Sequence, residues 1–335
     1  MAPTTLQTVW FLLIGVLLAG YSVLDGFDLG VGLFFPFLAK SEEDKQVLFR
    51  AIGPFWDGNE VWLLAGGGAL FAAFPLAYAT VFSGFYLALM IVVVALIFRS
   101  VSFEFRGHDP KRCDFWERAF FIGSFLPALL FGLALGNILQ GIPLNSNGEF
   151  TGSFFTLLRP FPLAVGLLGL STFLLHGTAY ALLKTEGELK ARAKRLAGWL
   201  WWIEAGLFLL GLFMSFLYLP WAKNKILAWP AAAVFLLSLA GLKAALAWDK
   251  DRPAFLMTSL SWLSLWGLAG AVLYPALVRA SEPGLNLTAA NASSSPLTLR
   301  VMFIIALVGL PVVIASTAFL YKVFKGRVKP ERGGY

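Results

Sequence analysis

Apolar residues fill nine long runs of this chain, and short polar segments separate them. A run of about 20 apolar residues can cross the ~30 Å hydrocarbon core of a bilayer as an α-helix. The pattern therefore predicts an all-α, polytopic membrane protein with nine transmembrane helices. The predicted spans are 8–36, 52–74, 77–98, 118–139, 160–182, 198–219, 226–248, 254–278 and 299–322.

The polar segments between the runs are too short to form soluble domains. The longest are 99–118 and 279–297. We expect a single transmembrane domain over 1–335, with helices one to four and five to eight as bundles and a final helix after them. The composition agrees, because 59% of the residues are hydrophobic and 13% are charged, against about 45–50% and 25% in soluble domains.

Lysine and arginine gather in alternate segments between the predicted helices. The segments 37–51, 99–118, 183–197, 243–253 and the tail from 322 hold 21 of the 26 basic residues. Basic residues are enriched on the cytoplasmic side of membrane proteins, so the split predicts an outer N-terminus and a cytoplasmic C-terminus. The net charge of +7 reflects this orientation and does not indicate a nucleic-acid partner.

Four acidic residues interrupt the first two apolar runs: Asp25, Asp28, Asp57 and Glu60. An ionised side chain at the centre of a bilayer costs about 2.5–3.5 kcal/mol even on the lenient insertion scale. We therefore expect these acids to face a protein interior or a wet cavity. Intramembrane acids often mark proton or ion routes, which indicates a protein that handles a proton or a cation, or that assists a subunit that does.

In the first predicted helix, Asp25 and Asp28 are three residues apart and should share one helix face. Gly26 and Gly30 form a small-xxx-small pair that would allow a neighbouring helix to approach closely. Two acids on one face favour a polar path through the membrane. The alternative is that the carboxylates only join neighbouring helices through hydrogen bonds.

In the second predicted helix, Asp57 lies about one turn inside the membrane and Glu60 lies one turn further on the same face. Together with Asn59 they predict a polar ladder that leads inward from the cytoplasm. Trp56 fits either an interfacial anchor or part of a quinone or lipid site. The sequence predicts that the glycines Gly66, Gly67 and Gly68 are a close-packing or kinked stretch. They are not a phosphate-binding loop, since no lysine follows them.

We expect no metal or cofactor to be bound by this chain alone. The single cysteine, Cys113, excludes an intrachain disulfide and a cysteine metal cluster. The two histidines are His108, in a basic loop, and His176, in the fifth predicted helix. The chain therefore has no pair of membrane histidines for a bis-histidine haem.

Several motifs resemble subunit II of the cytochrome bd-type quinol oxidases. They are the LDGFDLGVG segment at 24–32, the WDGNEVW segment at 56–62 and the GNILQGIP segment at 136–143. The resemblance is strongest over 1–143 and thinner over 144–335, where the loops between helices six and nine look short for the family.

This resemblance implies a heterodimer with subunit I, which carries two haems b, one haem d and the quinol-oxidising loop. The complex would oxidise quinol, reduce oxygen to water with cytoplasmic protons, and reside in a bacterial or archaeal cytoplasmic membrane. A small single-helix accessory subunit is also compatible with the family. Subunit II would be a haem-free support, and some members hold a quinone in it, for which Trp56 and Arg99 could supply contacts.

The resemblance also implies that acids of subunit II contribute to a proton route. On this sequence Asp57 would be the entrance, with Glu60 beside it and Asp25 or Asp28 as the relay. Two alternatives stay open. One is a proton-coupled secondary transporter, and the other is a purely structural subunit whose acids only hold helices and the haem-bearing partner in place.

Overall fold

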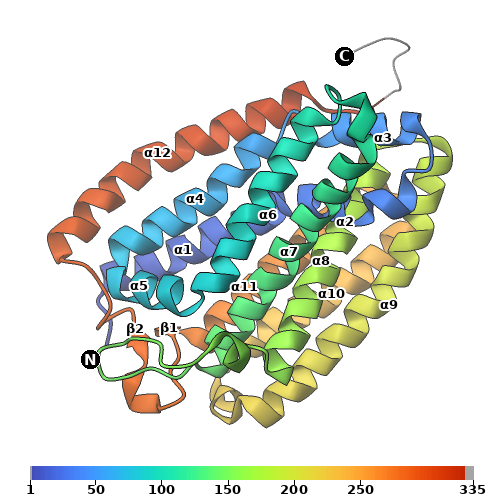
Figure 1. Ribbon diagram of the computed structural model, residues 1–335. Helices are drawn as coiled ribbons and strands as arrows, with labels where there is room; N and C mark the ends of the chain where they lie inside the picture. Colours follow the sequence, from blue (N-terminus) through green and yellow to red (C-terminus); the bar gives the residue numbers. More distant parts are fainter. Residues whose placement is uncertain (1, 329–335) are drawn as a thin grey trace.

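The computed structural model of the chain describes residues 2–328, with the side chains of all except Lys223 and Pro283 (Figure 1). The predicted domain covers 1–335, so residues 1 and 329–335 of it lie outside the described residues. They include Lys329 and Arg332, two basic residues of the predicted C-terminal tail. The helices are α1 (Thr5–Leu24), α2 (Gly26–Leu38), α3 (Glu42–Ile52), α4 (Trp56–Ala73), α5 (Pro75–Gly84), α6 (Tyr86–Phe105), α7 (Cys113–Gln140), α8 (Pro160–Lys184), α9 (Gly187–Tyr218), α10 (Ala228–Ala247), α11 (Asp251–Leu273) and α12 (Pro296–Val323).

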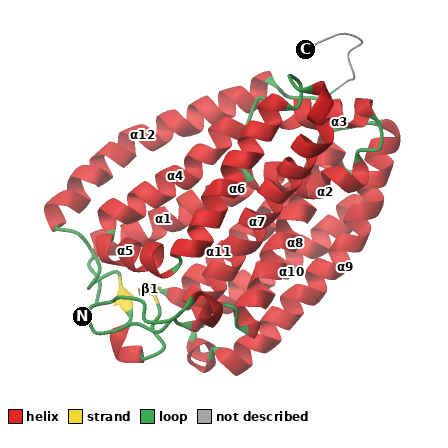
Figure 2. Ribbon diagram, viewed as in Figure 1, coloured by secondary structure: helices red, strands yellow, loops and turns green. Residues whose placement is uncertain are grey.

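Long helices make up nearly the whole molecule and run side by side (Figure 2). Within residues 2–328, eight helices are long and apolar enough to cross a membrane, when α1 and α2 are taken as one. This confirms the predicted class, a helical multi-pass membrane protein. The second predicted span, α4, is not among the eight, because Asp57, Asn59 and Glu60 lower the mean hydropathy of its first turns.

Close glycine contacts bring α2 and α8 together. A Cβ atom on Gly30 would lie 2.1 Å from the carbonyl oxygen of Phe173, and one on Gly177 would lie 2.5 Å from the Cα of Gly30. Neither position has room for a larger residue, because the two backbones are in contact. Beside this crossing the rings of Phe27 and Tyr180 stack with 3.9 Å between their centroids. The crossing therefore fixes where α2, and the acids near its start, lie in the bundle.

Several predicted boundaries are wrong, and the largest error is at the sixth helix, which begins at Gly187 instead of 198. The first helix is interrupted at Asp25, which separates α1 from α2. The third is divided at Phe85 into α5 and α6, and α6 ends at Phe105 instead of 98, so Arg99 belongs to the helix and not to the polar segment 99–118. The eighth ends at Leu273 instead of 278. Tyr274 follows and precedes Pro275, and a residue before proline is disfavoured in the helical conformation. The next residues form strand β1 (Ala276–Val278), which pairs with β2 (Leu287–Thr288).

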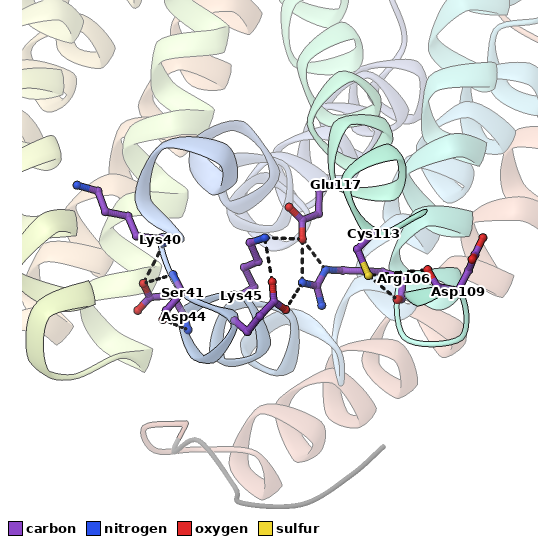
Figure 3. A network of polar contacts seen from close by, with 9 residues as sticks. Lys40, Ser41, Asp44, Lys45, Arg106, Asp109, Cys113 and Glu117 are labelled. Atoms are coloured by element: carbon purple, nitrogen blue, oxygen red, sulfur yellow. Dashed lines mark hydrogen bonds and ion pairs between the residues drawn. The ribbon is translucent and has the colours of Figure 1, made fainter. Parts of the chain in front are cut away.

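The bundle has two distinct ends, which we call the α3 end and the β end. The α3 end contains α3 and the N-termini of α4, α7, α9 and α11, and the β end contains β1 and β2 (Figure 1). At the α3 end an ionic network joins α3 to α7 (Figure 3). Arg106 lies 2.8 Å from Glu117, and Lys45 lies 2.9 Å from the same carboxylate.

Candidate functional site

An ion pair between Asp25 and Arg99 occupies the interruption of the first spanning helix. Asp25 is both the last cap of α1 and the first cap of α2, and Arg99 reaches it from α6. The two guanidinium nitrogens of Arg99 lie 2.8 Å from Oδ1 and 3.0 Å from Oδ2 of Asp25. Both side chains are buried, at 0% and 2% exposure. Bidentate pairs of this kind are among the strongest hydrogen-bonded contacts in proteins.

Glu60 of α4 is the third member of this cluster. Its Oε1 lies 3.0 Å from Nη1 of Arg99, and its side chain is 23% exposed. Asp57, one turn earlier on α4, is exposed and has no ion pair within the described part of the chain. The acids therefore become progressively more buried from Asp57 through Glu60 to Asp25.

Asp28 belongs to a second, adjoining set of contacts. Nδ2 of Asn59 donates to Oδ2 of Asp28 at 2.7 Å and to the carbonyl oxygen of Leu24 at 2.9 Å. The hydroxyl of Tyr321, on α12, donates to Oδ1 of Asn59 at 3.3 Å. The other carboxylate oxygen of Asp28, Oδ1, is buried and has no hydrogen-bond partner among the described residues. Asp28 thus has one oxygen without a hydrogen bond, whereas both oxygens of Asp25 accept one from Arg99.

The guanidinium of Arg99, a residue expected to contact a quinone, is buried and faces Asp25 and Glu60. Trp56 is half-buried, and its ring lies 5.5 Å from that of Phe103. Arg99 and Trp56 line one small hollow together with Phe103, and the quinone or lipid contact expected of them stays a prediction.

Neither histidine is placed to hold a haem in this chain. In His176, Nδ1 lies 2.8 Å from the hydroxyl of Thr258 and Nε2 lies 2.9 Å from the carbonyl oxygen of Val23. A carbonyl can only accept, so Nε2 carries the hydrogen and donates it to Val23. His108 lies on the exposed turn after α6. Over residues 2–328 no group of three histidine, cysteine or acidic side chains is arranged to bind a metal ion.

The three glycines of α4 have different surroundings. A Cβ atom on Gly66 would lie 3.0 Å from Leu18, so this position lies at the contact between α4 and α1. Gly67 and Gly68 have no neighbour within 4 Å of an added Cβ in the described chain. The helix continues through all three residues to Ala73, and at Gly67 and Gly68 the described chain offers no close packing.

Two members of the site, Arg99 and Tyr321, are not expected beside these acids from the sequence. The hydropathy pattern places Arg99 in the polar segment 99–118 as a quinone contact, although a helix that begins at Tyr86 and has an ordinary spanning length of 20 residues includes it. A buried base is also the expected complement of buried acids, which was a usable signal. Tyr321 had no such signal, because its approach to Asn59 depends on how α12 packs.

Comparisons with known proteins agree over nearly the whole chain. The family model for cytochrome bd terminal oxidase subunit II matches residues 6–324. Subunit 2 of the cytochrome bd-I ubiquinol oxidase of Escherichia coli strain K12 is 35% identical, over 97% of this chain and 96% of the relative. Subunit 2 of the cytochrome bd ubiquinol oxidase of Bacillus subtilis strain 168 is 34% identical, over 97% of each chain.

A solved structure shares the fold. A chain in the structure of bd oxidase from Geobacillus thermodenitrificans superimposes with a TM-score of 0.82 at 17% identity, covering 96% of this chain and 99% of that one. The family match also extends well beyond residue 143, so both halves of the chain contribute to the similarity. The chain therefore belongs to the family of subunit II of the cytochrome bd terminal oxidases.

Proposed function

We propose that this chain supports a haem-bearing subunit I in a quinol oxidase that reduces oxygen to water, and that it supplies a proton route to that complex. The relatives from E. coli and B. subtilis are both named as subunits of ubiquinol oxidases. The haems would be bound by the partner, which agrees with the engagement of both ring nitrogens of His176. Quinol oxidation would likewise take place on the partner.

The proposed topology adds α4 to the eight long apolar helices, which makes nine spans. It places the α3 end at the cytoplasm of a bacterial membrane. The contact of α4 with α1 supports this count, because Trp62 of α4 packs on Gly20 of α1, where an added Cβ would lie 2.5 Å from the indole ring. The polar first turns of α4 would then form the cytoplasmic mouth of the route. The α3 end also carries most of the basic residues, as the positive-inside rule requires.

The graded burial of the acids on α4 and α2 is the observation that carries the proposed proton route. Asp57 is exposed, Glu60 is partly exposed, and Asp28 is buried next to Asn59. A relay group must accept and release a proton. Asp28 suits this role better than Asp25, since Oδ1 of Asp28 is free, whereas both oxygens of Asp25 accept hydrogen bonds from Arg99.

Oxygen consumption by the purified complex tests this function. With Asp57→Asn we expect turnover to fall about tenfold or more, in line with the contribution of a positioned proton-transfer group, and haem content to stay intact. Asp114→Asn is the matched control, because Asp114 is also an exposed acid in the first turn of a helix at the α3 end. Full turnover in the Asp57→Asn complex would contradict the proton route.

A purely structural role is the second candidate, and the Asp25–Arg99 pair favours it. This pair joins the interruption of the first helix to α6, so it would stabilise the bundle whether or not protons pass. If the acids serve only this purpose, Asp57→Asn would leave turnover unchanged, and replacement of Asp25 would reduce assembly and haem content together.

A further inference from the structure

Basic side chains at the two ends of the bundle differ in whether they form ion pairs. At the α3 end many of them have a carboxylate partner. These are Lys45, Arg106, Lys190, Arg192, Lys194 and Arg327. At the β end, Lys225 and Arg279 form no ion pair with any described residue. Two neighbouring positive charges without a negative partner point to an anion that the chain itself does not supply.

The guanidinium of Arg279 stacks on an aromatic ring. Its Cζ lies 3.3 Å from the ring centroid of Trp221, in the short helix η3 (Pro220–Asn224). Its backbone is also anchored, because its carbonyl oxygen accepts from the amide of Ile142 at 2.9 Å. Its side-chain N–H groups have no hydrogen-bond partner among residues 2–328. Stacking fixes the plane of a guanidinium while leaving the N–H groups at its edge free to bind.

Lys225 directly follows η3, the short helix whose Trp221 stacks on Arg279. The pKa of Lys225 is lowered, mainly by burial and to a smaller extent by the positive charge of Arg279. Its ammonium group donates to the carbonyl oxygen of Tyr274, which leaves two of its three N–H donors for another acceptor. A bound anion would remove the repulsion between the two cations and satisfy their remaining donors.

The surface beside these cations is apolar. Ile226 and Leu227, directly after Lys225, are 78% and 75% exposed, and Trp229 is 49% exposed. The ring of Trp229 lies 6.2 Å from that of Phe216, at the end of α9. In spanning proteins tryptophan is enriched at the level of the lipid head groups, and exposed aliphatic side chains favour contact with the acyl chains. The cation pair is thus adjacent to a surface that suits acyl chains.

We propose that Lys225 and Arg279 bind the phosphodiester of an anionic glycerophospholipid at the β end, with its acyl chains along Phe216 and Trp229. Arginine binds phosphate oxygens through two parallel hydrogen bonds, and lysine adds a point charge. Basic pockets between spanning helices recognise anionic head groups in this way. The site lies at the opposite end of the bundle from Asp57, so it is independent of the proposed proton route.

Native mass spectrometry of the purified oxidase complex tests the lipid site. The complex is titrated with phosphatidylglycerol or phosphatidylcholine in the wild type, Lys225→Gln and Arg279→Gln. Arg300→Gln is the control, since Arg300 is an exposed arginine in the first turns of α12 at the same end. We expect the first two variants to bind phosphatidylglycerol at least fivefold more weakly than the wild type and Arg300→Gln. All four should bind phosphatidylcholine equally.

Three results would overturn the proposal. The first is equal retention of phosphatidylglycerol in all four complexes. The second is full displacement of the bound lipid by millimolar inorganic phosphate, which would show a site for the free anion. The third is a photo-crosslinker at the exposed position of Ile226 that captures a protein segment in place of lipid. If Arg279→Gln reduces haem content and thus assembly, Lys225→Gln decides the outcome alone.

Discussion

Arg99 binds Asp25 through two hydrogen bonds, of 2.8 and 3.0 Å, at the point where the first spanning helix is interrupted. The same guanidinium also reaches Glu60 at 3.0 Å. One buried base therefore connects three separate segments, namely the α1–α2 junction, α4 and α6. Both the stability of the bundle and the placement of its acids depend on this contact.

Removal of Arg99 should destabilise the protein strongly. Arg99→Gln leaves the Asp25 carboxylate buried without a cation, and breaking a buried pair in this way costs about 3–5 kcal/mol. We expect a lower thermal unfolding temperature and reduced haem content in the purified complex. Asp25→Asn should have a smaller effect, because Arg99 keeps Glu60 as a partner.

The double variant Asp25→Asn, Arg99→Gln is the control for this prediction. It removes both buried charges, so it should unfold at a higher temperature than Arg99→Gln alone. Unfolding of the single Arg99→Gln variant at the wild-type temperature would show that the pair does not stabilise the fold.

Gly30→Ala should disrupt the crossing of α2 and α8. The added Cβ would lie 2.1 Å from a backbone oxygen, and overpacking of a close contact usually destabilises by about 1–3 kcal/mol. The purified complex should therefore unfold at a lower temperature. Gly206→Ala, in α9, is the control, since its added Cβ meets nothing within 4 Å. A complex with Gly30→Ala as stable as the Gly206→Ala complex would refute the packing argument.

The network at the α3 end should make a small, pH-dependent contribution to stability. The hydrogen bond from Arg106 holds the pKa of Glu42 below its ordinary value. A carboxylate whose pKa is lowered by folding stabilises the native state above its unfolded pKa of about 4.3. That stabilisation is lost as the pH falls through the lower folded value.

Thermal unfolding of Glu42→Gln against pH measures this contribution. At neutral pH the variant should be less stable by about 1 kcal/mol or less, since solvent screens an exposed pair, and the difference should vanish in acid. Glu43→Gln is the control, because Glu43 is exposed in the same turn and forms no ion pair within the described residues. A stability difference between the wild type and Glu42→Gln that grows as the pH falls would contradict this prediction.

Eight of the nine predicted spans correspond to helices that are long and apolar enough to cross a membrane, because each depends on a local property, a long apolar run. It also picked out Asp25, Asp28, Asp57 and Glu60, since charge in such a run is conspicuous at any position. It did not predict that Asp25 and Asp28 would take different partners. Their spacing suggests a shared face, but the helix is interrupted at Asp25, and each partner comes from a helix distant in sequence.

The boundaries near Arg99 and Pro275 failed for a related reason. Hydropathy marks where an apolar run stops, whereas a helix continues as long as its hydrogen bonds and packing allow. Arg99 could stay in α6 because Asp25 and Glu60 neutralise it. The strand after Leu273 formed because Pro275 prevented further helix and β2 offered a partner.

The rate of proton uptake during oxygen reduction tests the central claim most directly. The reduced complex is mixed with oxygen in the presence of a pH-sensitive dye, for the wild type, Asp57→Asn and the control Asp114→Asn. If the acids from Asp57 through Glu60 to Asp28 carry protons, uptake slows about tenfold or more in Asp57→Asn alone, with unchanged haem spectra. Uptake at the wild-type rate in Asp57→Asn would contradict the account and leave these acids a structural role.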